Sequence, residues 1–230
     1  MEDEGTYAFG LDSDKRQIKT IASNAGHCLW SGIADPDKAA RVAERLLRPD
    51  MWSGWGIRTL SASNPVYNPF SYQRGSVWPH DNAIAAAGFA RYGLHRPAQQ
   101  VARGILDAAA RFVSYRLPEV FAGLQREPAS FPVQYPGANI PQAWAAGSVF
   151  QIIQALLGLR GDVPNGRLLV DPQLPSWIPS LRLNGLQAGP VKLDLRFWRD
   201  AETTRCSVGR QRGGHLEVVQ RPMTEDDEPW

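Results

Sequence analysis

Residues 74–93, RGSVWPHDNAIAAAGFARYG, place an indole, an imidazole, an acid and an amide at the beginning of an otherwise small and apolar helix. Pro79 suits a first helical turn, because the N–H that proline lacks is one that a helix start leaves unbonded. The alanines and glycine of 83–92 suit close packing against neighbouring helices. The stretch therefore predicts a buried helix whose first turn aims polar and aromatic groups at a shared cavity. These groups belong to Trp78, His80, Asp81 and Asn82.

A similar texture recurs along the chain. Apolar helices are expected at 24–33, at 79–92 and from Pro141, and amphipathic helices at 34–47 and 96–117. The apolar helices begin about 55–60 residues apart, a period suited to stacked helical hairpins. An alternation of inner apolar and outer amphipathic helices describes an α/α toroid. The expected fold class is therefore mainly α, a partial toroid followed by a small antiparallel β segment.

Two long loops, 48–78 and 117–140, lead into the second and third apolar helices. Loops of this length within a compact domain are more often functional than not. In a toroid such loops wall the central cavity, so chemistry is expected there.

The expected domain organisation follows these changes of texture. Residues 1–162 are expected to form the toroid part, with an N-terminal hairpin at 6–22. Short β-like runs separated by Gly, Pro and Asn turns predict an antiparallel segment at 163–222. The remaining residues, 223–230, form an acidic tail.

Composition excludes several classes of protein. Of the 230 residues 43% are hydrophobic and 21% charged, which is ordinary for a globular chain, and the net charge of +2 leaves no basic surface for nucleic acid. No apolar run reaches the roughly 18 residues that a membrane span needs. The first residues lack the pattern of a signal peptide, so a cytoplasmic location is expected. Cys28 and Cys206 offer neither a disulfide framework nor metal spacing, and two buried or half-buried thiols are expected.

Glu119 is the candidate carboxylate of the 117–140 loop. It lies between Pro118 and Val120, next to Phe121, so an aromatic environment is expected to raise its pKa or hold it for proton transfer. On the local sequence alone, a capping or salt-bridged surface glutamate is the competing interpretation. A metal site at His80 and Asp81 is not expected. Adjacent residues on a helix point in different directions, and no third ligand follows at matching spacing.

Five segments, in order, together resemble a known family. They resemble the carboxy-terminal half of bacterial amylo-α-1,6-glucosidase or glycogen-debranching-like proteins of the six-hairpin glycosidase group. The segments are SNAGHCLWSGIA (23–34), SGWGIRTLS (53–61), YQRGSVWPHDNAIAAAGFARYG (72–93), RLPEVFAGLQR (116–126) and IPQAWAAGS (140–148). Residues 168–189 are similar to the short β segment that closes such chains.

The resemblance implies an inverting glycoside hydrolase site at the mouth of an (α/α)6 barrel. In such a site an acid protonates the leaving oxygen, and a carboxylate roughly 6.5–9.5 Å away activates water. The family's base matches Glu119, and the expected substrate is an oligosaccharide or α-glucan with α-glucosidic bonds. No cofactor and no metal are expected. The residues expected to bind the sugar are Trp55, Arg58, Trp78, His80, Asp81, Asn82 and Trp144.

The sequence departs from this family in one respect. A complete toroid has more helix pairs than the chain contains, so the general acid is expected upstream of Met1, and the missing N-terminal half of the same chain is an expected partner. Asp81 is expected to grip the sugar rather than replace that acid. The alternatives are a glycoside phosphorylase and a non-catalytic carbohydrate-binding toroid fragment.

Overall fold

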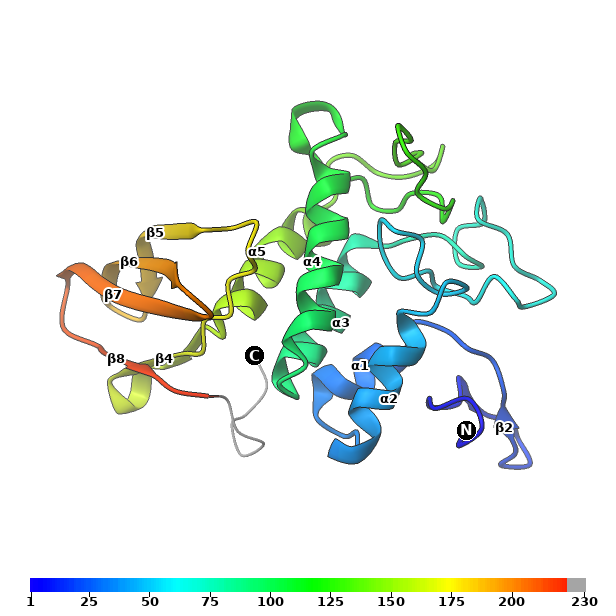
Figure 1. Cartoon of the computed structure of the whole chain (residues 1–230), viewed down its shortest axis with the longest axis horizontal. Helices are drawn as coiled ribbons and strands as arrows, with labels where there is room; N and C mark the ends of the chain where they lie inside the picture. Colours follow the sequence, from blue (N-terminus) through cyan, green and yellow to red (C-terminus); the bar gives the residue numbers. More distant parts are fainter. Residues whose placement is uncertain (223–230) are drawn as a thin grey trace. The chain divides into compact units, whose positions relative to one another are not determined.

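The computed structural model describes residues 1–222 (Figure 1). The helices lie close to the apolar and amphipathic runs from which they were expected. They are α1 (Ala25–Ser31), α2 (Pro36–Leu46), α3 (Pro79–Arg91), α4 (His95–Ala109) and α5 (Ala143–Leu157). Two short 3-10 helices follow α4 and β3, at Val113–Tyr115 and Val163–Asn165.

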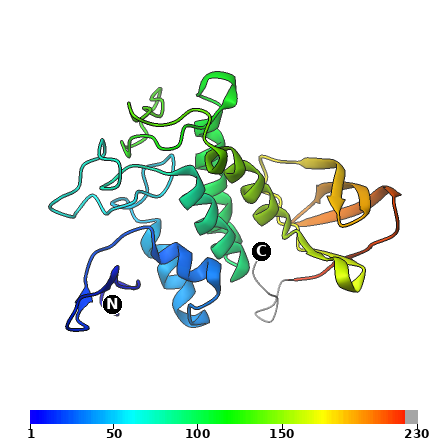
Figure 2. The ribbon, with the colours of Figure 1, turned by 180° about the vertical axis from the view of Figure 1, so that it is seen from behind.

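Helix α3 packs between α1 and α4 (Figure 2). Most of its side chains are buried, in agreement with its small and apolar composition. The approach to α1 depends on two glycines. A Cβ on Gly26 would lie 2.9 Å from the Ala85 Cβ, and one on Gly88 would lie 2.7 Å from the backbone N of Trp30. Small residues therefore allow the two helices to pack this closely.

Helices α2 and α4 each bury one face, as their sequence periodicity predicted. Helix α2 contacts α1, and helix α4 contacts α3. The buried face of α4 includes Val101, Ile105 and Ala108, and that of α2 includes Val42 and Leu46. The half-buried helix α1 is thus paired with the amphipathic α2, and the largely buried α3 with the amphipathic α4.

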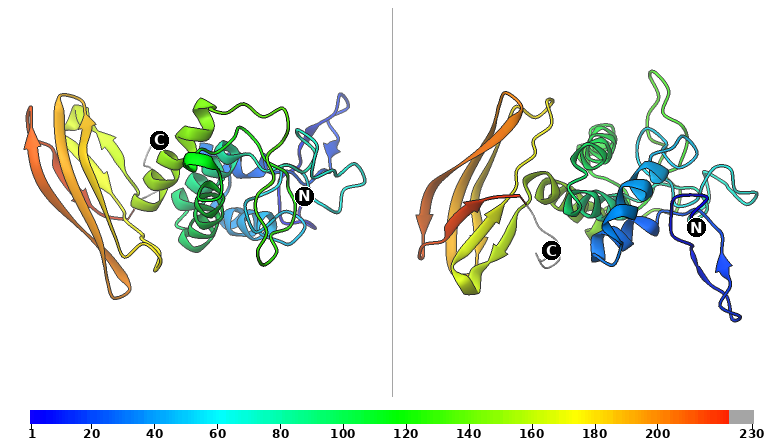
Figure 3. Two further views of the ribbon diagram at one scale, coloured as in Figure 1. Left: turned by 90° about the horizontal axis from the view of Figure 1, so that it is seen from above. Right: turned by 60° about the horizontal axis from the view of Figure 1, so that its bottom comes forward.

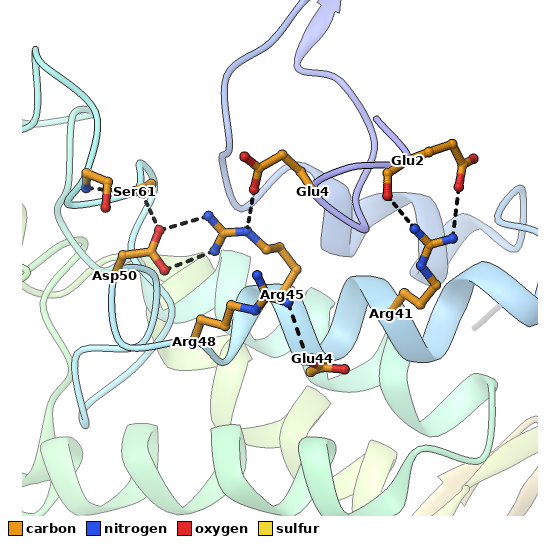
Figure 4. A network of polar contacts seen from close by, with 9 residues as sticks. Glu2, Glu4, Arg41, Glu44, Arg45, Arg48, Asp50 and Ser61 are labelled. Atoms are coloured by element: carbon orange, nitrogen blue, oxygen red, sulfur yellow. Dashed lines mark hydrogen bonds and ion pairs between the residues drawn. The ribbon is translucent and has the colours of Figure 1, made fainter.

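A network of ion pairs connects α2 to the N-terminal segment and to the long loop after it (Figure 4). The Arg45 guanidinium donates to both carboxylate oxygens of Asp50, at 3.0 and 2.9 Å, and contacts Glu4 at 3.3 Å. The Ser61 hydroxyl also donates to Asp50. The Arg45 side chain is only 6% exposed, so these contacts are largely shielded from water. They hold the beginning of the 48–78 loop against the helix.

The strands form three small sheets (Figure 3). An N-terminal antiparallel hairpin pairs β1 (Gly10–Leu11) with β2 (Gln17–Ile18). A second sheet has the order β3 (Arg160–Asp162), β4 (Arg167–Val170), β8 (Glu217–Gln220). The third is an antiparallel meander of β5 (Ser180–Ala188), β6 (Val191–Asp200) and β7 (Thr203–Arg212).

One strand pair differs from the expected antiparallel segment. Strands β4 and β8 run parallel, with Leu168 opposite Val218. The reason is topological, because the meander β5 to β7 lies between them in the sequence and returns the chain in the direction of β4. Residues 193, 195 and 197 alternate inward along β6 and pack with Leu168 and Leu157 in the core of this region.

The fold class is mixed helix and sheet, which corrects the expectation of a mainly α chain. The structure is 30% helical, and 23% of it is in strands or β-bridges. Part of the strand content lies in the long loops, where isolated β-bridges pair residues such as Val77 and Phe121. The local sequence predicted no regular structure there.

Backbone contacts divide the chain into two units within α5. The first unit is Met1–Ile152 and the second begins at Ile153. The expected division into a toroid part and a later β segment is not decided by this boundary and stays a prediction. The expected acidic tail at 223–230 lies outside the described residues. Among residues 1–222, no helix has the length and apolar character needed to cross a bilayer.

Candidate active site

Backbone pairing between loops brings the candidate residues together. Val77 and Phe121 exchange two hydrogen bonds, of 2.8 and 3.1 Å, and Phe121 also bridges to Gln134. Val77 is paired on its other side with Arg58. This irregular ladder joins the 48–78 loop to the 117–140 loop immediately before α3, so the first turn of α3 opens beside both loops.

A cavity of about 560 Å³ lies at this end of α3. Its wall is formed by the N-terminal hairpin, the segment before α1, the 48–78 loop, and the first turns of α3 and α5. The lining residues are Phe9, Thr20, Ala22, Ser23, Asn24, Thr59, Leu60, Val66, Tyr72, Gln73, Arg74, Trp78, His80, Asp81 and Trp144. The mixture of aromatic rings and polar groups is the kind of wall that binds a sugar ring.

Asp81 presents one bonded and one unbonded oxygen. Its Oδ1 lies 2.6 Å from Nε2 of His27, and this hydrogen bond raises the pKa of His27 although partial burial opposes the rise. Its Oδ2 is buried and has no hydrogen-bond partner among residues 1–222. Because a buried carboxylate oxygen without a partner is costly, Oδ2 is suited to accept a hydrogen bond from a hydroxyl group entering the cavity.

His80 and Trp144 form a stacked pair in the cavity wall. Their ring centroids are 4.1 Å apart and the planes differ by 9°. The Trp78 indole meets both rings edge-on, at 5.5 Å from His80 and 5.9 Å from Trp144. Burial lowers the pKa of His80, which favours the neutral imidazole, and its buried Nδ1 has no hydrogen-bond partner in the described part of the chain. A neutral imidazole can both donate to and accept from sugar hydroxyls.

Glu119 is 4% exposed and receives hydrogen bonds on both carboxylate oxygens. The Tyr72 hydroxyl donates to Oε1 at 2.6 Å, and Asn139 donates to Oε2 from its side-chain amide at 3.0 Å and its backbone N–H at 3.2 Å. The bond from Tyr72, followed by those from Asn139, lowers the pKa of Glu119 although burial opposes the fall. Of the two expectations for Glu119, a raised pKa is wrong, because hydrogen bonds to the charged form outweigh desolvation, and a role in proton transfer stays a prediction.

Trp55 and Arg58 are buried in the support of the loops and are not among the residues that line the cavity. Trp55 is 2% exposed, and the guanidinium of Arg126 lies 4.2 Å above its ring. Arg58 is 3% exposed and donates to the Gly123 carbonyl at 2.7 Å and to Gln125 Oε1 at 3.0 Å. The polar groups of the Arg58 side chain are thus occupied within the protein.

Asn82 is also turned away from the cavity. It is fully buried, its Oδ1 accepts from the Ile57 N–H at 2.6 Å, and its Nδ2 donates to the carbonyls of Ile57 at 3.1 Å and Trp78 at 3.0 Å. This side chain holds the 48–78 loop against the beginning of α3. The expected contact of Trp55, Arg58 and Asn82 with sugar receives no support from this geometry and stays a prediction.

The eight sequence-predicted residues therefore separate into three groups, one of which is the buried set Trp55, Arg58 and Asn82 described above. Four line the cavity together, and Glu119 adjoins it through Tyr72. The four are Trp78, His80, Asp81 and Trp144.

Sequence reasoning did not assign Tyr72, His27 or Asn139 to the site. Tyr72 begins the third of the five motifs and His27 lies in the first, so both belong to segments that carry the family resemblance. What the sequence could not give was their partners across the fold.

Metal binding and thiol chemistry receive no support from the described part of the chain. Among residues 1–222, no group of three His, Cys, Asp or Glu side chains could hold a metal ion. Cys28 and Cys206 are free and half-buried. Burial raises the pKa of Cys28 and raises that of Cys206 to about 11, which keeps both thiols protonated at neutral pH.

Comparison with known proteins identifies a family. Residues 5–122 match the mannosylglycerate hydrolase MGH1-like glycoside hydrolase domain. Mannosylglycerate hydrolase MGH1 of Selaginella moellendorffii is 34% identical over 88 residues, which cover 38% of this chain and 18% of that protein. The chain thus spans only a small part of the length of this curated relative.

One solved structure agrees at the level of the fold. An uncharacterised conserved protein from Thermus thermophilus superposes with a TM-score of 0.52 at 21% identity, covering 66% of this chain and 36% of that chain. A GH63 mannosylglycerate hydrolase of the same organism, in complex with glucose, gives a TM-score of 0.47 at 20% identity, covering 60% and 32%.

The resemblance seen in the sequence is thus confirmed for glycoside hydrolases, and its narrower form, amylo-α-1,6-glucosidase, is not specifically supported. The family match covers half of the chain, including the segment before α1, the 48–78 loop, α3 and Glu119. The chain belongs to the MGH1-like glycoside hydrolase family.

Proposed function

We propose that this chain carries the general-base side of an inverting glycoside hydrolase site, with Glu119 as the base. The observation that carries the proposal is the set of hydrogen bonds from Tyr72 and Asn139, which keep the Glu119 carboxylate charged beside a cavity suited to a sugar. A charged carboxylate can accept a proton from water, whereas a neutral one cannot.

In the proposed reaction, the oxygen of a water molecule bonds to the anomeric carbon while Glu119 takes one of its protons. The bond from that carbon to the leaving oxygen breaks, and a general acid protonates the leaving oxygen. Asp81 already accepts a hydrogen bond from His27 and so acts as an acceptor in the fold. An acceptor suits sugar hydroxyls, so we propose a binding role for Asp81. We assign the general acid to none of the described residues and propose the whole activity for a complete enzyme that contains this chain.

The proposed sugar-binding wall consists of Trp78, His80, Asp81 and Trp144. Stacked rings offer a flat surface to the C–H groups of a sugar, and the unbonded Asp81 Oδ2 and His80 Nδ1 offer hydrogen bonds to its hydroxyls.

The proposed substrate class is an α-glycoside with a small acidic leaving group, as in mannosylglycerate. The family match supports this choice, and Arg74 is a cationic residue of the cavity wall that would suit a carboxylate. A second candidate is a neutral α-glucosidic oligosaccharide such as an α-1,6-linked glucan. The aromatic and uncharged character of most of the wall favours it.

The test is an assay of the complete polypeptide that carries this chain, on mannosylglycerate and on isomaltose, with the product anomer followed by proton NMR. We expect an inverted first product and a loss of about 10²- to 10⁴-fold in kcat for Glu119→Gln. The exposed Glu127→Gln serves as the matched control and should retain activity. A retained anomer, or full activity of Glu119→Gln, would exclude Glu119 as the base. Turnover that requires phosphate would favour a phosphorylase, and sugar binding without turnover a binding module.

A further inference from the structure

Tyr72 belongs to two parts of the molecule at once. It is one of the residues that line the cavity, and its hydroxyl donates to Oε1 of the nearly buried Glu119 at 2.6 Å. The residues are 47 positions apart in the sequence, so the bond joins two separate loops. The cavity wall is thereby connected directly to this carboxylate.

The backbone of Tyr72 is held firmly in its loop. Its carbonyl accepts hydrogen bonds from the Ser76 hydroxyl at 2.7 Å and from the Trp78 indole N–H at 2.9 Å. The loop itself is closed by the Asn68 N–H, which donates to the Arg74 carbonyl at 2.7 Å. These bonds fix the point from which the tyrosine side chain extends.

The ring of Tyr72 is held between two other aromatic rings. Trp78 meets it edge-on with centroids 4.7 Å apart, and Tyr135 lies 5.5 Å away at a tilt of 56°. Aromatic pairs at such distances add to the stability of a side-chain position beyond the area they bury. The hydroxyl is therefore directed by packing as well as by its own hydrogen bond.

The groups around Glu119 identify Tyr72 as its donor on one side. Asn139 bonds to Oε2, and the Gln142 side chain adds a smaller contribution that lowers the Glu119 pKa. His80 is close enough for the charge of Glu119 to act on it. The bond to Glu119, followed by burial, raises the pKa of Tyr72, so its hydroxyl remains a donor across the neutral range.

We propose that Tyr72 is the positioning residue of Glu119, holding its carboxylate oriented at the cavity through the bond to Oε1. Its role is not catalytic, because a protonated phenol cannot remove a proton from water. The catalytic consequence rests on the proposed function of Glu119, whereas the hydrogen bond and its effect on the carboxylate do not. The two can therefore be tested separately.

The first experiment follows the Glu119 carboxyl by carbon NMR in protein labelled with ¹³C-glutamate, with Glu119→Gln used to assign the signal. In Tyr72→Phe we expect the Glu119 pKa to rise by about one unit, because a hydrogen bond to the charged form is lost. Tyr135→Phe is the matched control, since it removes a hydroxyl from the same aromatic group and should leave the signal unchanged. A Tyr72→Phe titration identical to that of this control overturns the inference.

A second variant guards against failure of Tyr72→Phe to fold. Incorporation of 3-fluorotyrosine at position 72 keeps the ring and makes the hydroxyl a stronger donor, so the Glu119 pKa should fall below that of the unmodified protein. A rise or no change would contradict the inference.

Activity of the complete enzyme provides the third readout. The acidic limb of the kcat/KM profile should move to higher pH in Tyr72→Phe by the same amount as the NMR titration. A carboxyl that shifts in Tyr72→Phe, combined with full hydrolysis by Glu119→Gln, would reject the proposed base and leave the positioning role intact. An unshifted carboxyl combined with an inactive Glu119→Gln would reject only the role of Tyr72.

Discussion

The Nε2 atom of His27 lies 2.6 Å from Oδ1 of Asp81, although the two residues are 54 positions apart in the sequence. The contact connects α1 to α3 at the edge of the cavity and leaves Asp81 Oδ2 unbonded.

This contact predicts a pH dependence of stability. Because the pKa of His27 is raised in the folded protein, its contribution to stability is fully present below the ordinary histidine pKa of about 6.5 and is lost as pH rises through the higher folded value. The free energy of unfolding of the unmodified protein should therefore exceed that of His27→Gln by more at pH 5.5 than at pH 9. Solvent screening should keep the difference below about 1 kcal/mol, because the His27 side chain is 41% exposed.

The check is urea unfolding of both proteins at the two pH values. In an Asp81→Asn background the same His27→Gln comparison should lose its pH dependence. A difference that grows toward high pH would contradict the assignment of the contact as a charged pair.

Asn82 predicts a stability effect rather than a binding effect. Asn82→Ala removes the partner of the buried Ile57 N–H and of two carbonyls, so it should lower the free energy of unfolding by about 3 kcal/mol. Asn24→Ala is the control, because Asn24 makes no side-chain capping bond at the beginning of α1 and should change stability by less than about 0.5 kcal/mol. Equal losses in the two variants, measured by denaturant unfolding, would show that the Asn82 bonds do not hold the loop.

Two glycines in helices predict changes of opposite sign. Gly88→Ala places a methyl group 2.7 Å from the Trp30 backbone N and should destabilise the protein by about 1–3 kcal/mol. At Gly147 in α5 an added methyl group would meet no atom of residues 1–222 within 4 Å apart from the backbone of its own helix, so Gly147→Ala should stabilise by about 0.5–1 kcal/mol. Thermal unfolding of the two variants measures both, and a stabilising Gly88→Ala would mean that α1 and α3 pack less closely than described.

The ion pairs of Figure 4 predict unequal effects for two neighbouring arginines. Arg45→Ala leaves Asp50 without its bidentate partner and should cost about 3 kcal/mol, because the arginine side chain is only 6% exposed. Arg48→Ala breaks an exposed pair with Glu44 at 3.4 Å and should cost at most about 0.5 kcal/mol. Denaturant unfolding at low and high salt tests this, and a loss in Arg45→Ala no larger than in Arg48→Ala would contradict it.

The helices could be read from the sequence because their signals are local. Pro36 and Pro79 mark first turns, and the apolar spacing of α2 and α4 repeats within a few residues. The parallel pairing of β4 with β8 could not be read in this way. It depends on where the intervening meander returns the chain.

The residues that line the cavity were predictable by segment and only partly by residue. The first turn of α3 was expected to face a cavity, and Trp78, His80 and Asp81 line it. Arg58 stood in a promising loop, yet acceptors from the 117–140 loop occupy its guanidinium. The direction of the Glu119 pKa was misjudged for the same reason, because Tyr72 is distant in the sequence.

The bond between Tyr72 and Glu119 also bears on which parts of the chain form early and which form late in folding. It closes a loop of 47 residues, and the contact of His27 with Asp81 closes one of 54. Such closures cost chain entropy before any contact rewards them, whereas single helical turns form from near neighbours. Helical content should therefore return before the cavity forms when the unfolded chain is diluted from denaturant.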